Sequence, residues 1–167
     1  MAARRTLTFL LLTVLVAMAG ESEGIRDVII EPEFSGVLQA EPALLHDGGA
    51  KVIEIHGKRY FIAVGVTTVG PNSAQEKLRQ VRVGRIQAMK AAAEFIQQTK
   101  VSAQEKLTQE SMVSRVDGAK SSSSTKTFEE STLTQIEALL KVPPQIGSWK
   151  SSDGQLYFCA IGTQLRP

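Results

Sequence analysis

The amino-acid sequence predicts an α+β domain. We expect an antiparallel sheet of about four to five strands, in the order β-β-α-β-β-β, with one long helix packed on one face. Three stretches predict this fold: residues 51–69 and 145–164 each have the composition of a β-hairpin, and residues 73–100 carry the one long helical pattern in the chain. We therefore expect the helix to cover the sheet and to organise the fold.

Residues 1–20 are predicted to be a secretory signal peptide. Two arginines precede an apolar run at residues 7–16, and alanines at 17 and 19 stand where a signal peptidase would cut. The run is shorter than the about 20 apolar residues that a membrane-spanning helix needs. We therefore expect export to the periplasm or the cell exterior, with cleavage favoured over retention as an anchor. No cysteine lies near the cleavage point, so we expect no lipid attachment there.

Charge gives no sign of a nucleic-acid partner. The chain has 19 Lys and Arg against 17 Asp and Glu, and two of the arginines lie in the predicted signal peptide. The mature chain is therefore expected to be neutral, and a neutral chain has no general attraction for nucleic acid. The single cysteine excludes an internal disulfide framework and a multi-cysteine metal site.

Two segments follow the predicted signal peptide. Residues 21–50 are predicted to be an irregular N-terminal arm on the surface, with at most one short edge strand, because prolines and Asp47-Gly48-Gly49 interrupt its short apolar pieces. Residues 51–165 are predicted to form a single α+β domain.

The second strand of the first predicted hairpin is apolar on both faces. Alternation gives one bulky face and one face of smaller residues. The bulky face consists of Tyr60, Ile62, Val64 and Val66, and the other of Phe61, Ala63, Gly65 and Thr67. We expect the helix to cover the bulky face, and we expect the other face either to be closely approached by another element or to meet water.

The predicted helix begins with a capping box. The Ser73 hydroxyl can accept from the Glu76 backbone N–H while the Glu76 side chain returns to the Ser73 N–H. Gly84 in mid-helix costs about 1 kcal/mol relative to alanine, which indicates close approach to the sheet. The apolar stripe expected to pack on the sheet is Leu78, Val81, Ile86, Met89, Ala93 and Ile96.

The other sides of this helix are basic. Five basic residues form a possible partner-binding face: Lys77, Arg79, Arg82, Arg85 and Lys90. A solvated helix surface is the ordinary interpretation of such charges. An anionic partner is the alternative.

Residues 101–140 are predicted to form two long, largely polar antiparallel strands joined by the serine tip at 121–124. Two alternatives stay open. Residues 129–140 could form a short amphipathic helix, and the hexapeptide at 73–78 recurs at 102–107, so the same capping box could start a second helix at Ser102. The last hairpin is predicted to turn at Asp153-Gly154, followed by a central strand that is apolar on both faces.

No residue pattern in the sequence predicts a catalytic, cofactor-binding or metal site. His46 and His56 lack the spacing of a helical zinc site, and no nucleophile elbow or phosphate-binding glycine loop is present. Cys159 lies among apolar residues, which predicts a buried, inert thiol. We therefore expect a non-enzyme without a cofactor, although a hydrolase that uses a serine, His46 or Cys159 stays as an alternative.

The order of elements resembles two related bacterial envelope families. The features are residues 60–65 closing a strand, a helix with Arg85, Ala88, Ala92 and Ile96 at regular spacing, long Ser/Thr/Glu-rich strands, and then Trp149 followed by Asp153-Gly154 and Tyr157. They resemble the Lpp-twenty membrane-associated lipoproteins and the N-terminal domain of flagellar assembly protein T. The chain departs from these families in two ways. It has Gly84 where their helix pattern opens with alanine, and it lacks the lipid-attachment cysteine of the lipoproteins.

The resemblance implies a small α+β domain that serves as an envelope or flagellar accessory protein without catalysis. The expected partner is a protein or another cell-envelope component. Capture of an anion or a polysaccharide by the basic helix face is the second expectation. Contact with a membrane and the oligomeric state are left open.

Overall fold

The computed structural model describes residues 24–113 and 123–166, and the side chains of 106–113 and 123–129 are not part of that description. The predicted signal peptide lies outside the described residues. The helices and strands follow one another as β1 (Ile25–Ile30), α1 (Pro32–Gln39), α2 (Pro42–His46), β2 (Gly49–Ile55), β3 (Lys58–Thr68), α3 (Ala74–Val113), α4 (Ser123–Lys141), β4 (Gln145–Ser151) and β5 (Leu156–Leu165).

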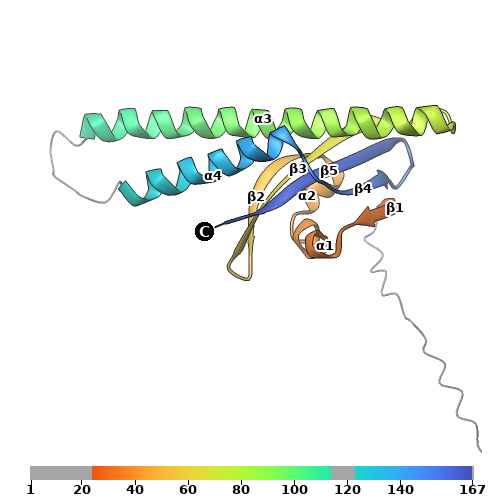
Figure 1. Ribbon diagram of the computed structural model, residues 1–167, viewed down its shortest axis with the longest axis horizontal. Helices are drawn as coiled ribbons and strands as arrows, with labels where there is room; N and C mark the ends of the chain where they lie inside the picture. Colours follow the sequence, from red (N-terminus) through yellow and green to blue (C-terminus); the bar gives the residue numbers. More distant parts are fainter. Residues whose placement is uncertain (1–23, 114–122, 167) are drawn as a thin grey trace, which may run out of the picture.

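The five strands form one antiparallel sheet in the order β1-β4-β5-β3-β2 (Figure 1). The α+β class, the strand number and the long helix on one face are thus confirmed, whereas the predicted order β-β-α-β-β-β is wrong, because β1, α1 and α2 precede the first hairpin and α4 follows α3. The central pair is β3 and β5, which share ten register positions from Arg59 opposite Leu165 to Thr68 opposite Leu156. Helices α3 and α4 cover one face, here called the α3 face, and α1 and α2 cover the other, here called the α1 face.

The bulky face of β3 packs against α1 and α2, so the prediction that the long helix covers it is wrong. Tyr60, Ile62 and Val64 are buried in one cluster with residues of the two short helices. Phe34 of α1 meets Tyr60 edge to face, with ring centroids 5.7 Å apart. From β4, the Trp149 Nε1–H donates to the Leu45 carbonyl oxygen of α2 at 2.9 Å. The short helices therefore supply the cover that the sequence assigned to the long one.

The long helix instead lies on the small-residue face of β3. A Cβ on Gly65 would lie 2.1 Å from the Gly84 carbonyl oxygen and 2.2 Å from the Ala88 nitrogen. The predicted reason for Gly84, close approach of helix and sheet, is confirmed. The residues of α3 that are buried recur every four positions: Gln80, Gly84, Ala88, Ala92 and Ile96.

The predicted apolar stripe of α3 is wrong in its first half, at Leu78, Val81 and Ile86, and right at Met89 and Ile96. Ile96 is buried, but Leu78 and Ile86 are 62% and 61% exposed. Backbone contact at Gly65 leaves room only for glycine and alanine beneath the middle of the helix. The large side chains Leu78 and Ile86 are therefore displaced from the contact with the sheet, whereas Phe95 and Ile96 further along the helix reach the core.

The two predicted strands within residues 101–140 are helical. Helix α3 continues through Ser102 to Val113, so no second helix starts at the repeated hexapeptide, and α4 runs from Ser123 to Lys141. Part of the serine tip, 121–122, lies outside the described residues. Buried Leu133, Ile136 and Leu139 of α4 recur at helical spacing against the α3 face. The alternative that residues 129–140 form an amphipathic helix is thus confirmed, although the helix is longer than predicted.

The prediction of an irregular arm is wrong for its described part. Strand β1 is the expected edge strand, but α1 and α2 follow it, each with proline at the start of the helix. Proline is favoured at the first position of a helix, because the N–H that proline lacks would have no hydrogen-bond partner within the helix there. Phe34, Val37 and Leu38 of α1 are buried, so this segment is part of the core.

The local signals for turns and caps are confirmed with one exception. The Glu76 N–H donates to the Ser73 hydroxyl at 3.2 Å, but the Glu76 carboxylate accepts from Arg79 instead of from the Ser73 N–H. Asp153 accepts from the Gln155 N–H at 2.9 Å in the last hairpin turn. Among the described residues, no helix has the length and apolar character needed to cross a membrane.

Candidate protein-docking face

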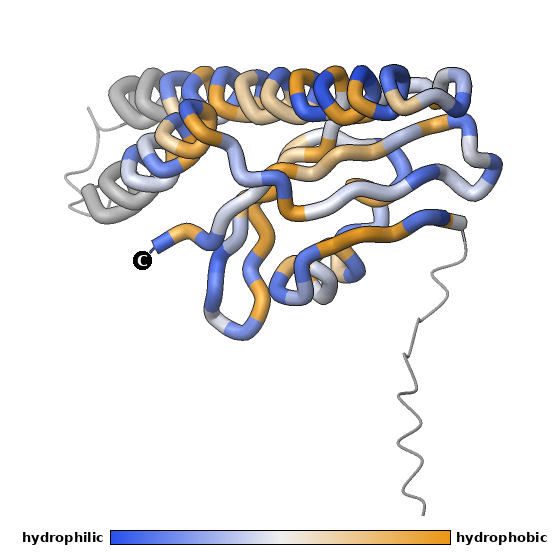
Figure 2. Tube along the Cα trace, turned by 45° about the vertical axis from the view of Figure 1, so that its right-hand side comes forward, coloured by the Kyte–Doolittle hydropathy of each residue, from blue (hydrophilic) through white to orange (hydrophobic). Residues whose placement is uncertain are grey.

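Part of the α3 face is left uncovered by the helices. Helix α3 lies over β3 with β5 and β2 beside it, and α4 packs near the end of β5. Strands β4 and β1 extend beyond this cover, and Figure 2 shows β1, coloured orange over most of its length, at the edge of the sheet away from α3.

The strand register identifies the residues on this surface. Tyr157 and Cys159 of β5 point toward α3, because a Cβ on Gly84 would meet Tyr157 Cε1 at 3.3 Å and Cys159 Cβ at 2.9 Å. Residues directly opposite each other in antiparallel strands share a face. Lys150 and then Arg26 lie opposite Tyr157, while Ser148 and then Ile29 lie opposite Cys159. We call the five outer positions the open face: Arg26, Ile29, Ser148, Lys150 and Tyr157.

The open face combines an exposed apolar side chain with polar groups. Ile29 is 74% exposed, the largest exposure of any large apolar side chain in the sheet. Tyr157 is partly buried, and burial raises the pKa of its phenol. The phenol stays neutral at physiological pH and able to form hydrogen bonds, and Ser148 is one partner.

Lys150 holds the bulged edge strand in place. Its Nζ donates to Asp27 Oδ2 at 2.6 Å, and this hydrogen bond and the lysine charge lower the pKa of Asp27. Asp27 has a φ of 51° and lies where the pairing of β1 with β4 shifts register, between Arg26 and Ile29. The ion pair is exposed and contributes little to stability, but it links β4 to the residue at the bulge of β1.

One side of α3 borders the open face. The Arg85 guanidinium donates to the Pro143 carbonyl oxygen at 2.5 Å, at the connection that leads into β4. Val81 and Arg85 are four residues apart, which places them on one side of the helix. That side borders the connection into β4, and it carries Val81 at 36% exposure.

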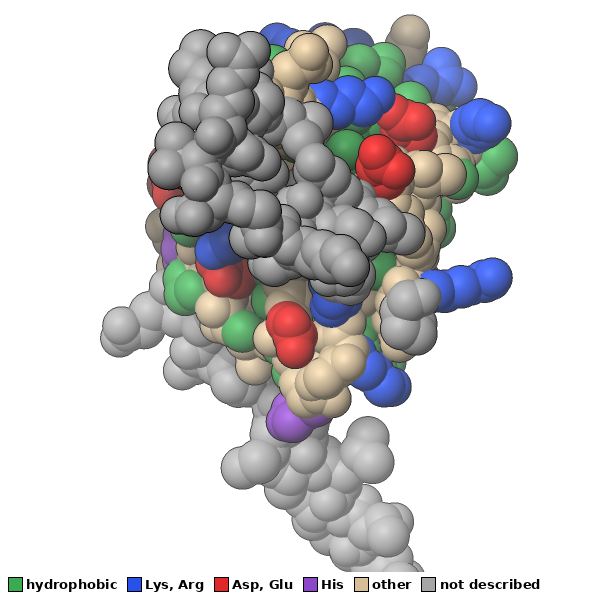
Figure 3. Space-filling view, turned by 90° about the vertical axis from the view of Figure 1, so that its left-hand side faces the viewer, with side chains coloured by type: hydrophobic (Ala, Val, Ile, Leu, Met, Phe, Trp, Pro, Cys, Tyr) green, Lys and Arg blue, Asp and Glu red, His purple; other side chains and the backbone are tan. Residues whose placement is uncertain are grey.

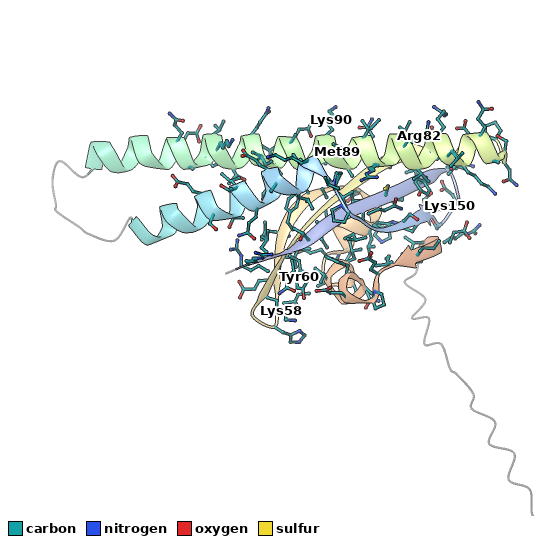
Figure 4. The ribbon with its side chains drawn as sticks, in the orientation of Figure 1. Lys58, Tyr60, Arg82, Met89, Lys90 and Lys150 are labelled. Atoms are coloured by element: carbon teal, nitrogen blue, oxygen red, sulfur yellow. The ribbon has the colours of Figure 1, made fainter. Side chains whose placement is uncertain are left out.

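The structure divides the predicted basic face. Arg79 pairs with Glu76 at 2.7 Å, and Lys90 pairs with Glu94 at 3.8 Å. Figure 4 shows Lys90 on the side of α3 away from the sheet, whereas Arg82 lies at the same end of the molecule as Lys150 of β4. Lys77 and Arg82 form no ion pair within the described part of the chain. Of the five predicted residues, Arg85 is the one whose contact places it beside the open face.

Among the described side chains at the end of the molecule from which α3 and α4 project, Figure 3 shows both acidic and basic ones. Lys100 of α3 pairs with Glu137 of α4 at 2.6 Å. Such exposed pairs contribute little to stability, but they neutralise the surface around them.

The residues named in the hydrolase alternative lie apart. Cys159 is buried under α3, and burial raises the pKa of its thiol to about 11. His56 is in the turn before β3, and the first residue of that strand, Lys58, already lies about 23 Å along it from Gly65, the partner of Cys159, at about 3.3 Å per residue. His46 ends α2 on the opposite face of the sheet. The described residues contain no group of three or more His, Cys, Asp or Glu that could hold a metal ion.

Most of the open face was missed by the sequence reasoning. Arg26 and Ile29 lie in the segment predicted to be irregular, and the bulge at Asp27 breaks the alternation that would have placed them on one face. Lys150 and Tyr157 lie in the predicted last hairpin. Because they alternate with Trp149 and Phe158 along their strands, the sequence could have placed them together on the opposite face of the sheet.

Comparison with known protein families, with curated proteins and with solved structures gives no match for this chain. The resemblance to the two envelope families therefore stays a prediction.

Proposed function

We propose that the protein is an exported, non-catalytic module that binds another component of the cell envelope or of a surface assembly. The observation that carries the proposal is the open face beside α3, where exposed apolar side chains lie next to basic ones. Exposed large apolar groups with a polar surround are typical of interaction sites.

The packing supports a surface that receives a partner. The helices of the α3 face pack on β3, β5 and β2. Among the described residues, no helix covers the α3 face of β4 and β1. On the α1 face, by contrast, β4 contributes the fully buried Trp149 to the core. The same strand is thus covered on one face and open on the other.

Export is supported by the sequence of residues 1–20, with its basic start, apolar run and small residues at the expected cut. N-terminal sequencing of the protein from its native cells tests this part. We expect the mature chain to begin close to residue 21 and to fractionate outside the cytoplasm. A cytoplasmic protein that retains residues 1–20 would contradict export.

Site-specific photo-crosslinking tests binding. A photoreactive phenylalanine derivative is placed at Ser148, at the centre of the open face, in the full chain expressed in its native cells. The matched control carries the same group at Lys90, which is on the outward side of α3. We expect one discrete protein adduct from Ser148 and none from Lys90.

The adduct distinguishes the proposed function from general surface contact. A mutant Ile29→Ser in the Ser148 background should reduce its yield, because Ile29 lies directly opposite Ser148 on β1. The absence of any adduct at Ser148, or equal adducts at both positions, would count against a binding module that uses this face.

A further inference from the structure

We propose that the open face receives its partner as a short acidic amphipathic helix that lies beside α3. This inference rests on the proposed function and deepens it, because it names the chemistry and conformation of the binding segment.

The dimensions of the open face fit one helix. Two neighbouring strands span about 10 Å, which is the diameter of one helix with its side chains. Strand β4 has seven residues, from Gln145 to Ser151. At about 3.3 Å per residue it is about 23 Å long, which matches a helix of about 15 residues. The uncovered strands therefore leave the place of one more helix in the layer that α3 and α4 form.

The charges favour an acidic helix. Arg26 and Lys150 lie on the open face, and Arg85 lies on the bordering side of α3. Two acids are nearby: Asp27 is paired with Lys150, and Asp153 accepts hydrogen bonds within its own turn. Arg26 and Arg85 form no ion pair within the described residues, since Arg85 donates to a carbonyl oxygen. The charge of Arg26 acts on Asp27 and Asp153 without forming an ion pair with either. Carboxylates of a partner would supply the direct contact that Arg26 and Arg85 do not make with an acid.

The exposed apolar side chains favour a partner helix that is also amphipathic. Ile29 projects from the strand, and Val81 lies on the side of α3 that carries Arg85. A helix in this place would contact Ile29 of β1 on one side and Val81 of α3 on the other. The basic side chains of Arg26 and Arg85 would lie beside these apolar contacts. Apolar anchors at helical spacing, with acidic residues beside them, are the complement of this surface.

A partner strand added to β1 fits the structure less well. The Glu31 N–H donates to the Ile146 carbonyl oxygen, so alternation leaves only the backbone groups of Val28 and Ile30 directed outward past the bulge. Two residues give a short ladder, and a bulged edge is a feature that discourages strand addition.

The test measures binding of a designed peptide to the full chain. The probe is a fluorescein-labelled peptide of about 15 residues with leucines at helical spacing and glutamates elsewhere. Its controls are a permuted peptide of the same composition without an apolar face, and a version with lysine in place of glutamate. Fluorescence anisotropy at about 0.1 M salt gives the dissociation constant.

We expect the acidic amphipathic peptide to bind at least about tenfold more tightly than either control peptide. The variants Ile29→Ser and Arg26→Glu should each weaken it about tenfold. The matched variants Val101→Ser, at an exposed apolar position of α3 beyond its contact with the sheet, and Lys90→Glu should leave binding unchanged.

Equal binding of the permuted or lysine peptide would overturn the inference, as would equal sensitivity to the control variants. Phosphatidylglycerol vesicles form a separate arm. If they bind in an Ile29-dependent and Arg26-dependent way while the peptide does not, the face recognises an anionic membrane and the helix is refuted. A Ser148 adduct in cells without peptide binding would refute the helix and leave the proposed function standing.

Discussion

Replacing Gly65 by alanine tests the close approach of helix and sheet directly. The added Cβ would lie 2.1 Å from the Gly84 carbonyl oxygen and 2.7 Å from the carbonyl carbon of Gln87. Both are backbone atoms of α3, so no side-chain rotation relieves the overlap. To bring the shorter contact to an ordinary 3.4 Å, the helix must retreat by about 1.3 Å.

That retreat sets the expected loss of stability. Ala88 and Ala92 are fully buried where α3 meets the sheet, and Ile96 is 6% exposed. A radial gap of about 0.5–1 Å already removes a quarter to a half of each dispersion contact. Overpacking of a core commonly costs about 1–3 kcal/mol and occasionally more, so we expect Gly65→Ala to lower the free energy of unfolding by about 3 kcal/mol.

Urea unfolding followed by far-ultraviolet circular dichroism measures this loss, provided that the slope with denaturant is unchanged. Gly36→Ala in α1 is the matched control, because nothing lies within 4 Å of its added Cβ. The control should stabilise the protein by about 0.5–1 kcal/mol through helix propensity. A Gly65→Ala protein within about 0.5 kcal/mol of the parent would refute the packing described above.

Three further predictions concern single side chains. Trp149→Phe removes the 2.9 Å hydrogen bond to the Leu45 carbonyl oxygen, and thermal unfolding should show a loss of about 1–3 kcal/mol. Cys159 has a pKa raised from 9.0 to about 11, so at pH 8 iodoacetamide should label the native thiol at least about 100-fold more slowly than the unfolded one. The unfolded thiol loses its proton first, so this group lowers stability as pH rises from 9.0 toward about 11. His56→Asn should stabilise by about 0.5 kcal/mol in the same thermal assay, because His56 has a φ of 52° in a two-residue turn.

Each of these predictions has an opposing result. An unchanged melting temperature for Trp149→Phe would mean that the link between β4 and α2 contributes nothing. Labelling of native Cys159 at the unfolded rate would mean that α3 does not cover it, and Cys159→Ser controls for other reactive groups. For the turn, His56→Val should destabilise, since a β-branched residue disfavours positive φ, and equal effects of the two substitutions would contradict the turn geometry.

Local signals gave the parts of the fold that depend on a few neighbouring residues. The Ser73 cap, the turn at Asp153 and the mid-helix Gly84 have the structure that the sequence predicts. Residues 101–113 are predicted as a strand because their few apolar residues show no helical spacing, whereas Leu133, Ile136 and Leu139 carry the helical spacing that left a helix open for 129–140.

The candidate site was predictable only in part. Arg85 belongs to the basic face proposed from the sequence, and its hydrogen bond to Pro143 places it beside β4. Arg26 and Ile29 come from the first strand and Lys150 from the fourth, and pairing across the sheet brings them together. A single sequence carries no signal for that juxtaposition once a bulge interrupts the alternation of β1.

By itself the sequence determined that this protein has a capped long helix, two hairpins and a strand, β3, that is apolar on both faces. Only the tertiary structure decided which face of β3 each helix covers. Both faces of a central strand satisfy a hydrophobic pattern equally well, so pattern does not choose between them. The choice came from shape: Gly65 admits the backbone of α3 at Gly84, while the bulky side chains around Tyr60 fill the space under α1 and α2.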